Sequence, residues 1–428
     1  MRIAMEAEVG IAGYGTTTPG IQGRIKAAPE DFVVEEIPAE IPVDAAGRFL
    51  VVRVTVRNWE THRLVRQLAR SLGISRKRIS FAGTKDKRAI TTQRMTFEGL
   101  NEVDLEAIHL KDITLEPLHR TPRRLALGDL LGNRFHITLR EVDLAEHDAR
   151  GRLQSLDREL QGAGGYPNFF GIQRFGELRP LSHRVGRAMV RGDLEGAVTL
   201  YVGEAFPGED ADTSQARTAF RETGDAGRAL KDLPRHLSFE RTLLHHLHER
   251  PGDHGGALLR FPHSLLTLFV NAYQSYLFNR ILSLRLAGGM PLNEPTPGDL
   301  LLPLDQRGLP DRRRSIAVTE VNREKVARQT RAGKAWVSGL LAGYEVALAG
   351  GEMGRLERQV IQEEGVDLKD FTVRALPGLA SRGLRRALVA PVRDFTFDFE
   401  EGVCLAFTLN PGSYATGLLR EVIKGDSL

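Results

Sequence analysis

The sequence contains almost no cysteine and no long apolar segment, and each absence excludes a class of protein. The one cysteine, Cys404, cannot form a disulfide within the chain or a cysteine-based zinc site, so we expect a small buried side chain there. No apolar run approaches the roughly 18 residues that a membrane-spanning helix needs. The first residues hold no apolar core of signal-peptide length and include Glu6. We therefore expect a soluble, cytoplasmic protein.

The sequence also lacks a strong excess of either charge. It has 59 basic and 55 acidic residues and a net charge of +4, so charge alone does not identify a nucleic-acid partner. Most of the basic residues are arginines, whose guanidinium groups bind phosphate with two hydrogen bonds and stack on bases. A genomic preference for arginine codons explains the same composition at least as well. The composition therefore permits an RNA partner without predicting one.

A chain of 428 residues exceeds what one hydrophobic core usually organises, which predicts two domains or one domain with a large insertion. Runs of β-branched residues predict strands over 31–37 and 49–56, and alternation predicts another over 134–140, followed by a helix from about 143 to 161. Near the C-terminus, alternating phenylalanines from 395 to 399 predict a strand that pairs with 403–409.

Strand patterns at both ends surround a mostly helical middle, from about 177 to 375, in which we find no internal repeat. This order predicts an α+β protein in which the two ends form one sheet domain and the middle is inserted into it. The glycines of 162–165, followed by Tyr166 and Pro167, indicate a domain junction. We expect boundaries at 1–165 and 377–428 for the sheet domain and at 166–376 for a helix-rich α+β insertion.

A basic helix is predicted just before the most unusual segment of the chain. Thr61 can cap it, Leu64, Val65, Leu68 and Leu72 share one face, and Gly73 ends it. The opposite face carries Arg63, Arg66 and Arg70, and residues 76–78 continue the positive charge. A phosphate backbone could bind there. A solvated helix face is the plainer interpretation, and it is favoured for an arbitrary protein.

The unusual segment is residues 83–89, GTKDKRA, in which Asp86 is flanked by Lys85, Lys87 and Arg88. Neighbouring cations favour the ionised form of a carboxyl group, and a charged carboxylate can act as a nucleophile or a base at neutral pH. A turn with a local ion pair explains the same residues, and composition alone favours it.

Residues 80–93, SFAGTKDKRAITTQ, resemble the signature of the TruD family of tRNA pseudouridine synthases. Further segments resemble family motifs in the same order, at 29–36, 128–135, 168–176, 412–416 and 419–421. Between about 180 and 375 the resemblance is thin, apart from residues 271–279. One position departs from the family pattern, because Asn410 stands where proline is usual two residues before Gly412. Ordered matches over nearly the whole chain are far more specific than one motif, and the length resembles the archaeal-like long form.

The resemblance implies a fold, a reaction and a catalytic residue. It implies a catalytic domain of the pseudouridine synthase type, with a mixed, mainly antiparallel sheet. The reaction converts uridine to pseudouridine, usually at position 13 in the D arm of tRNA, with Asp86 as the catalytic carboxylate and no metal or organic cofactor. The sequence fits this, since it has no Walker loop and no dinucleotide fingerprint. Whether Asp86 attacks the sugar or the base, or removes a ribose proton, stays open.

Four more residues match family positions near the substrate. Phe32 and Tyr414 resemble aromatic contacts to an extruded base, Asn133 resembles the amide that binds the uridine, and Lys26 resembles a basic residue that could bind phosphate. Plainer roles stay open for each of them: Phe32 as core, Asn133 as a left-handed turn residue, Tyr414 as packing at a helix start. Ser413 is expected to cap that helix. Gln173 and Arg174 are expected to organise the domain junction.

Other functions remain as alternatives. A non-catalytic tRNA-binding protein or RNA chaperone could keep the same fold, and a hydrolytic enzyme could release the base with the same acid. The histidines at 245, 246, 248 and 254 could bind a metal, but they lack the spacing of a helical zinc protease, so we expect no metal site. The sequence indicates no obligate protein partner.

Overall fold

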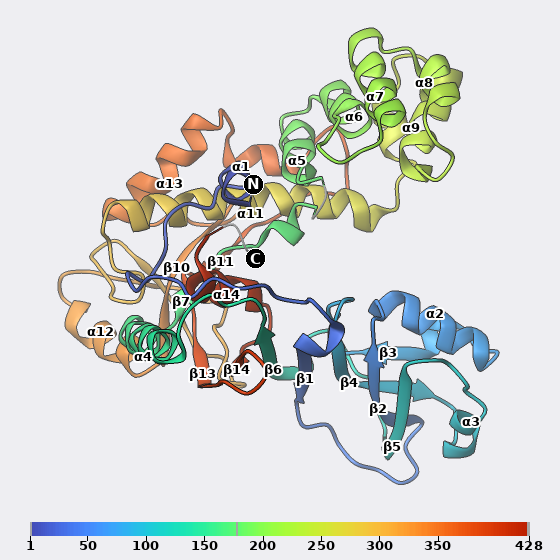
Figure 1. Ribbon diagram of the computed structural model, residues 1–428. Helices are drawn as coiled ribbons and strands as arrows, with labels where there is room; N and C mark the ends of the chain where they lie inside the picture. Colours follow the sequence, from blue (N-terminus) through green and yellow to red (C-terminus); the bar gives the residue numbers. More distant parts are fainter. Residues whose placement is uncertain (1, 177–178, 426–428) are drawn as a thin grey trace. The chain divides into compact units, whose positions relative to one another are not determined.

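The computed structural model describes residues 2–176 and 179–425 (Figure 1). It divides the chain into two compact units. The first, which we call the sheet unit, comprises Thr16–Tyr166 and Ala390–Leu428. The second, which we call the inserted unit, comprises Met1–Gly15 and Pro167–Val389. Both units contain helices and strands, and the α+β class expected from the sequence is confirmed.

Two boundaries of the units differ clearly from those expected from the sequence, at residues 15/16 and at 389/390. The first 15 residues group with the inserted unit because Asn279 Nδ2 donates to the carbonyl of Val9 at 3.0 Å and Ser283 Oγ donates to that of Gly10 at 2.8 Å. The chain returns to the sheet unit at Ala390, because residues 384–387 still pair with a strand of the inserted unit. Neither hydrogen bonding between distant segments nor the pairing of a short strand leaves a local pattern in the sequence.

The sheet unit is built on one mixed sheet. Among the described residues, its strands follow the order β13-β14-β6-β1-β4-β2-β5, with β3 paired to β4, and only β1 and β4 run parallel. The predicted strands are present. Their bounds are β1 (Phe32–Pro38), β2 (Phe49–Arg57), β3 (Ile79–Phe81), β4 (Ile90–Glu98), β5 (Ile113–Thr121), β6 (Leu130–Leu139), β13 (Val392–Asp398) and β14 (Val403–Leu409).

Helices cover one face of this sheet and form two separate apolar cores with it. Helices α4 (Glu146–Ala163) and α14 (Ala415–Ile423) pack on β14, β6 and β1. Helix α2 (Thr61–Ser71) packs on β2 and β4. Figure 1 shows α2 and the short α3 (Glu102–Glu106) beside the β2 and β5 end of the strand series. The single-turn helices η1 (Pro29–Asp31) and η2 (Arg76–Arg78) precede β1 and β3.

The predicted basic helix is α2, but its cap is not the expected one. Leu64, Val65 and Leu68 are buried, as the pattern indicated. At the start, the carboxylate of Glu60 accepts hydrogen bonds from the backbone N–H groups of His62 and Arg63 at 2.8 and 2.7 Å. Glu60 is therefore the cap, and the hydroxyl of Thr61 serves another purpose described below. A carboxylate suits this place because it also meets the positive end of the helix dipole.

The inserted unit contains a long helix and a small sheet whose strands the sequence pattern did not locate. The four-stranded sheet has the order β11-β10-β8-β9, and its strands are short, two to seven residues each, so their pattern is weak. The strand bounds are β8 (Leu300–Pro303), β9 (Ile316–Ala317), β10 (Ala335–Leu341) and β11 (Leu384–Ala387). Two-residue strands, β7 (Tyr166–Pro167) and β12 (Val389–Ala390), lie where the chain passes between units.

The inserted unit is built on the long helix α11 (His263–Ala287), whose side chains are buried along most of its length and against which α5 and α13 pack. Besides α11, the helices of this unit are α1 (Arg2–Glu8), α5 (Ser182–Val190), α6 (Leu194–Gly203), α7 (Ala211–Thr223), α8 (Ala226–Asp232), α9 (Ser238–Glu249), α10 (His254–Leu258), α12 (Arg323–Arg331) and α13 (Gly351–Glu363), with the single-turn helices η3 (Ile172–Arg174) and η4 (Leu368–Thr372). Among the described residues, no helix combines the length and apolar character needed to cross a membrane.

Two of the family-like motifs bind one another inside this unit. The side chain of Asn279 on α11 accepts from the backbone N–H of Phe170 at 2.9 Å and donates to its carbonyl at 3.0 Å. Asn168 donates to the carbonyl of Ala387 at 2.9 Å, and the guanidinium of Arg386 lies 4.1 Å from the ring centroid of Phe170. The segments 168–176 and 271–279 therefore hold the inserted unit together.

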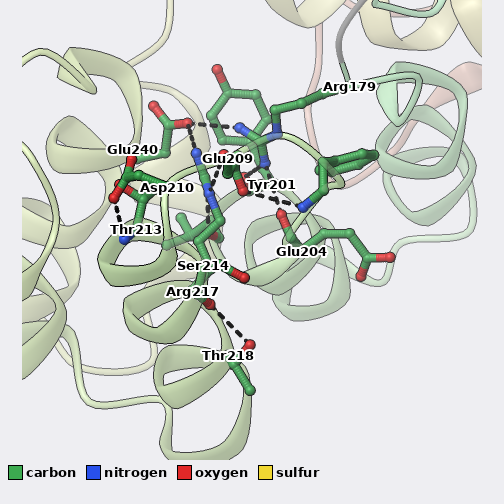
Figure 2. A network of polar contacts seen from close by, with 12 residues as sticks. Arg179, Tyr201, Glu204, Glu209, Asp210, Thr213, Ser214, Arg217, Thr218 and Glu240 are labelled. Carbon is green, nitrogen blue, oxygen red and sulfur yellow. Dashed lines mark hydrogen bonds and ion pairs between the residues drawn. The ribbon is translucent and has the colours of Figure 1, made fainter.

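A buried polar network joins α6, α7 and α9 (Figure 2). Arg179 and Arg217 both donate to the same carboxylate oxygen of Glu240, at 2.8 and 3.1 Å, and the Arg217 side chain is fully buried. Glu209 supplies a second acceptor to Arg217 at 2.8 Å. Burial, reinforced by the charge of Glu240, raises the pKa of Tyr201 to about 12. Glu240 is thus shared by two guanidinium groups, and Glu209 adds a second counterion for Arg217.

We expect Glu240→Gln to destabilise the protein strongly. The amide has the same shape but no charge, so two neighbouring guanidinium groups, one fully buried, lose their shared counterion. Breaking a buried ion pair in this way costs about 3–5 kcal/mol. Urea denaturation would measure the loss. The matched control is Glu352→Gln in the exposed Arg355–Glu352 pair, which should change the free energy of unfolding far less, because solvent screens an exposed ion pair. Equal effects would contradict a stabilising role for the network.

Candidate active site

Asp86 lies on a loop, residues 82–89, that runs from β3 to β4 and is fastened by three segments. At its start, the carbonyl of Ala82 accepts from the backbone N–H of Gly128 at 2.8 Å. In its middle, the backbone N–H of Lys85 donates to Thr61 Oγ1 at 3.0 Å. At its end, the carbonyl of Ala89 accepts from the backbone N–H of Asn58 at 3.0 Å. The loop is therefore held in one position beside the start of α2.

The carboxylate of Asp86 is exposed and pairs with a lysine from a distant segment. Lys26 Nζ lies 2.9 Å from Asp86 Oδ1, with side-chain exposures of 17% and 43% respectively. The same ammonium lies 4.1 Å from the ring centroid of Phe32. An ammonium over an aromatic face is attracted by the ring quadrupole, so the ring helps to place the lysine. Lys26, Phe32 and Asp86 thus form one contact group, in which Lys26 touches both partners.

The segment that carries Lys26 is held in an unusual backbone conformation. Lys26 has a φ of 55°, in the left-handed region that costs free energy for residues other than glycine. Asp31, which is 1% exposed, accepts from the backbone N–H of Ala28 at 2.8 Å and from Arg140 Nε at 2.9 Å. Arg88 Nη2 donates to the carbonyl of Ala27 at 3.0 Å. These bonds hold the turn that places the Lys26 ammonium at Asp86.

Lys85 points away from Asp86 and into the sheet. Its ammonium lies 2.7 Å from Glu36 Oε2, and the two side chains are 4% and 1% exposed. The other Glu36 oxygen accepts from the backbone N–H of Arg94 at 3.2 Å. A buried ion pair needs such added hydrogen bonds to offset the loss of hydration. Lys85 therefore anchors the loop from below, while Lys26, from another segment, is the cation that contacts Asp86.

A row of polar side chains lies on the helix-covered face of the sheet. Directly paired residues share a face, and alternate residues of a strand return to it. Glu36 pairs with Asn133, and Thr91 pairs with both Val34 and Val56. Since Val34 belongs to one apolar core and Val56 to the other, the row lies between them. Its members, which we call the polar row, are Glu36, Thr91, Gln93 and Asn133.

The polar row contains carbonyl oxygens without partners. Asn133 Oδ1 and Gln93 Oε1 are buried and have no hydrogen-bond partner among the described residues. An unsatisfied buried polar group costs about 1–3 kcal/mol, so such groups usually mark a place that water or a ligand completes. Asn133 lies within β6, so the alternative of a left-handed turn residue is wrong. Gly132 beside it is required, since a Cβ there would lie 2.5 Å from the carbonyl oxygen of Leu409.

Tyr414 begins α14, shortly after β14, and is half-buried. Its carbonyl accepts from the hydroxyl of Tyr166 at 2.9 Å, which fixes the backbone at the start of the helix. The expectation that Ser413 caps this helix is wrong, because the cap position is Tyr414, whose side chain makes no cap hydrogen bond. The backbone N–H of Ser413 instead donates to the carbonyl of Asn410 at 3.2 Å, which closes the turn after β14.

Phe32 is a core residue in this structure. It is 1% exposed, and its ring meets Phe135 edge to face, with centroids 6.2 Å apart. The structure therefore connects Phe32 to Asp86 through Lys26, which contacts both. It places Asn133 opposite Glu36, and Glu36 pairs with Lys85, the residue before Asp86. Tyr414 is connected to this group only along the chain, because it follows β14, in which Leu409 pairs with Asn133.

Comparison with known proteins identifies the family. The chain matches the family described as tRNA pseudouridine synthase D (TruD) over residues 8–422. The chain belongs to the TruD family. Relatives named "Probable tRNA pseudouridine synthase D" include one from Methanococcoides burtonii, 42% identical with 99% of this chain and 98% of that protein covered, and one from Thermococcus onnurineus, 41% identical with 96% and 97% covered.

A solved structure agrees with this assignment. A crystal structure from Methanosarcina mazei, described as "Putative tRNA pseudouridine synthase D (TruD)", is similar with a TM-score of 0.88 and 39% identity, covering 99% of this chain and 98% of that one. TruD proteins isomerise uridine to pseudouridine in tRNA, and this chain is accordingly an isomerase of the pseudouridine synthase type.

Other residues considered from the sequence have structural contacts. His246 is buried and its Nε2 lies 2.7 Å from Asp253 Oδ2, while His245 and His248 are exposed. Arg174 Nε donates to Ser275 Oγ at 3.4 Å, within the inserted unit, whereas Gln173 is exposed. Cys404 was expected to be buried and is only half-buried, because it lies on the sheet face opposite the helices, 3.7 Å from Thr138 Oγ1.

Sequence reasoning missed three residues that build this TruD site. The family-like motif gives Glu36 no role of its own, and the sequence pattern predicts only a helix cap at Thr61. For Asp31 the pattern predicts only the start of a strand. Each acts on a residue far along the chain, so no local pattern showed the contact. One signal was available for Glu36, because a charged residue at an inward position of an otherwise apolar strand needs a partner.

Lys85→Met should destabilise this TruD protein because it leaves Glu36 buried without its cation, at a cost of about 3–5 kcal/mol. The double variant Glu36→Gln/Lys85→Met should recover part of the loss, since no unpaired charge then remains. Lys87→Met changes an exposed cation on the other side of Asp86 and should alter stability by about 0.5 kcal/mol or less. Urea denaturation of all three distinguishes them. Equal losses for the two single variants would show that the ion pair does not anchor the loop.

Proposed function

We propose that this enzyme isomerises the uridine at position 13 of tRNA to pseudouridine, with Asp86 as the catalytic carboxylate. The observation that supports the proposal is the exposed carboxylate of Asp86, which lies on a loop fastened at three points and pairs with the half-buried ammonium of Lys26. A group that must react with a substrate has to be accessible, and a group that must react at one atom has to be held still. As tRNA is a cytoplasmic molecule, we place the enzyme in the cytoplasm.

The reaction breaks one bond to the ribose and makes another. The bond from ribose C1′ to N1 of the uracil breaks, the ring turns, and C1′ bonds to C5. The hydrogen on C5 leaves as a proton and N1 gains a proton, so no atom is lost and no electron is transferred. The Asp86 carboxylate acts on the ribose or on the base during this sequence, as nucleophile or as base. Residues of the chain supply the chemistry of each step.

The proposed base contacts come from the polar row and from α14. A uridine has to leave its stack to reach a protein carboxylate, and enzymes hold such a base by edge hydrogen bonds and by stacking. Asn133 offers an amide whose Oδ1 has no partner among the described residues, which suits the uracil edge. Tyr414 offers a half-buried ring. Phe32 is buried under the Lys26 ammonium, so its contribution to substrate binding passes through Lys26.

Asp86→Asn should abolish the release of tritium from tRNA labelled at C5 of uridine, while most tRNA affinity remains, because binding is spread over many phosphate and stacking contacts. Asp143→Asn, which removes another exposed carboxylate of the sheet unit, should release tritium at the normal rate. A transcript with cytidine at position 13 should release none. Undiminished turnover by Asp86→Asn would refute the assignment.

The same assay separates the remaining alternatives. Salt-sensitive tRNA binding by the unaltered protein without tritium release would indicate an RNA-binding protein or RNA chaperone. Free uracil among the products would indicate a hydrolytic enzyme. Full tritium release from the transcript with cytidine at position 13 would show that the enzyme isomerises a uridine at another position of the RNA.

Lys26→Met should lower kcat by about 10²-fold and change KM little, because the ammonium holds Asp86 Oδ1 in place and a displacement of about 1 Å costs that much. Lys26→Arg keeps the charge and should recover part of the rate. Steady-state kinetics with tRNA measure both. A raised KM with unchanged kcat would show that Lys26 binds a substrate phosphate and does not position the carboxylate.

A further inference from the structure

The exposed face of α2 carries only positive charge. Arg63, Arg66 and Arg70, together with Gln67, line a surface pocket of about 200 Å³. All three arginines are exposed, and the helix, whose sequence is THRLVRQLARS, contains no acid. The pocket thus presents guanidinium and amide donors around one space. We call this set the arginine row.

The arginines of this row are not neutralised by the protein. None of them is in an ion pair among the residues that the structure describes. Some exposed arginines elsewhere in the sheet unit do have acidic partners, as in Arg24–Glu141, Arg53–Glu116 and Arg57–Glu30, at 3.2, 3.1 and 2.6 Å. In a chain with 55 acids, partners are plentiful, so an unneutralised row needs a reason.

Stability does not supply that reason. Arg66 and Arg70 are four residues apart, where like charges destabilise a helix by about 0.2–0.5 kcal/mol. Arg63 lies in the first turn, where the positive end of the helix dipole disfavours a cation. Only Arg70, in the last turn, is placed favourably. The packing of α2 uses the opposite face, and of these side chains only Arg63 touches the edge of the core, through the Trp59 ring.

The arginine row begins beside the loop of Asp86. Thr61, the first residue of α2, accepts the hydrogen bond from the Lys85 backbone N–H. His62 meets the ring of Phe81, just before the loop, with ring centroids 5.7 Å apart. From there the row extends from Arg63 to Arg70 over about 10 Å, at about 1.5 Å of rise per residue. Arg76 and Lys77 in η2, both exposed, continue the charge.

We propose that the arginine row binds the phosphodiester backbone of the RNA substrate, on one side of the nucleotide that reaches Asp86. This deepens the proposed function and rests on it for the identity of the RNA. A length of about 10 Å is enough to meet two or three successive phosphates, given the roughly 3.4 Å of axis per nucleotide along a strand. Guanidinium groups bind phosphate oxygens with two hydrogen bonds, and Gln67 adds an amide donor.

The arrangement favours phosphate over an acidic protein surface. Arg63 lies over the ring of Trp59, 5.3 Å from its centroid, which restrains the guanidinium and leaves its edge for an acceptor. Donors at successive turns of one helix suit the regular spacing of a sugar–phosphate chain. The row reads no base edge, so it contributes affinity and register and leaves selection of the nucleotide to the active site.

The test compares two doubly substituted proteins with the same change of charge. Arg63→Gln/Arg66→Gln alters the row, and Arg150→Gln/Arg158→Gln alters two exposed arginines of α4 in the same unit. Glutamine keeps the helix propensity of arginine, and equal unfolding midpoints would confirm intact folds. Affinity for an unmodified tRNA transcript is measured over a range of salt concentrations, with Asp86→Asn added so that the RNA is not consumed.

We expect the first double variant to bind the transcript several-fold more weakly and its log–log salt slope to decrease by about two, one for each lost phosphate contact. With Asp86 intact, its KM should rise and its kcat at saturating tRNA should stay unchanged. The α4 variant should match the unaltered protein. Equal binding by both variants, or a lowered kcat with unchanged affinity, would overturn the proposal.

This outcome is distinguishable from failure of the proposed function. Loss of affinity only in the first variant, with no tritium release by the unaltered protein, would leave the phosphate-binding row in place and refute the isomerase assignment. Normal tritium release with unchanged binding by the first variant would refute the row alone. A competition experiment could also refute the row. It would do so if an acidic polypeptide displaced the transcript from the unaltered protein and the two double variants bound the transcript with equal affinity.

Discussion

The ion pair between Lys85 and Glu36 is the interaction on which the arrangement of the candidate active site depends. Both side chains are almost fully buried, so water cannot replace either partner. Each charge therefore depends on the other to offset the hydration that it lost on burial. Lys85 precedes Asp86 directly, so its ion pair with Glu36 fixes the loop backbone next to the exposed carboxylate. An exposed carboxylate is thereby held by a buried neighbour.

The site combines segments that are far apart in the chain but adjacent in the sheet. The parallel pairing of β1 with β4 brings the segment of Lys26 and Phe32 to the end of the Asp86 loop. The pairing of β1 with β6 brings Asn133 opposite Glu36. Two apolar cores, one under α4 and α14 and one under α2, leave a polar row between them. Polar chemistry is thus possible on a face that is otherwise core.

The motifs shared with the TruD family divide by task. Residues 29–36, 80–93 and 128–135 meet around Asp86, whereas 168–176 and 271–279 bind one another inside the inserted unit. A matching motif therefore does not by itself identify a substrate contact. One segment can also combine a packing role with a possible binding role. In 128–135, Gly132 leaves room for the Leu409 carbonyl, and the next residue, Asn133, carries an oxygen without a hydrogen-bond partner among the described residues.

The sequence by itself determined the α+β class, five strands of the sheet unit, the amphipathic α2 and the resemblance of residues 80–93 to the TruD signature, because β-branched runs, helical periodicity and ordered motifs are local features. Only the tertiary structure decided which cation meets Asp86, that Glu60 and not Thr61 caps α2, and that residues 1–15 belong with the inserted unit. The physical reason is the same in each case. Flanking lysines look equivalent in a sequence, but burial of one against Glu36 and the left-handed turn at Lys26 are set by contacts across the sheet.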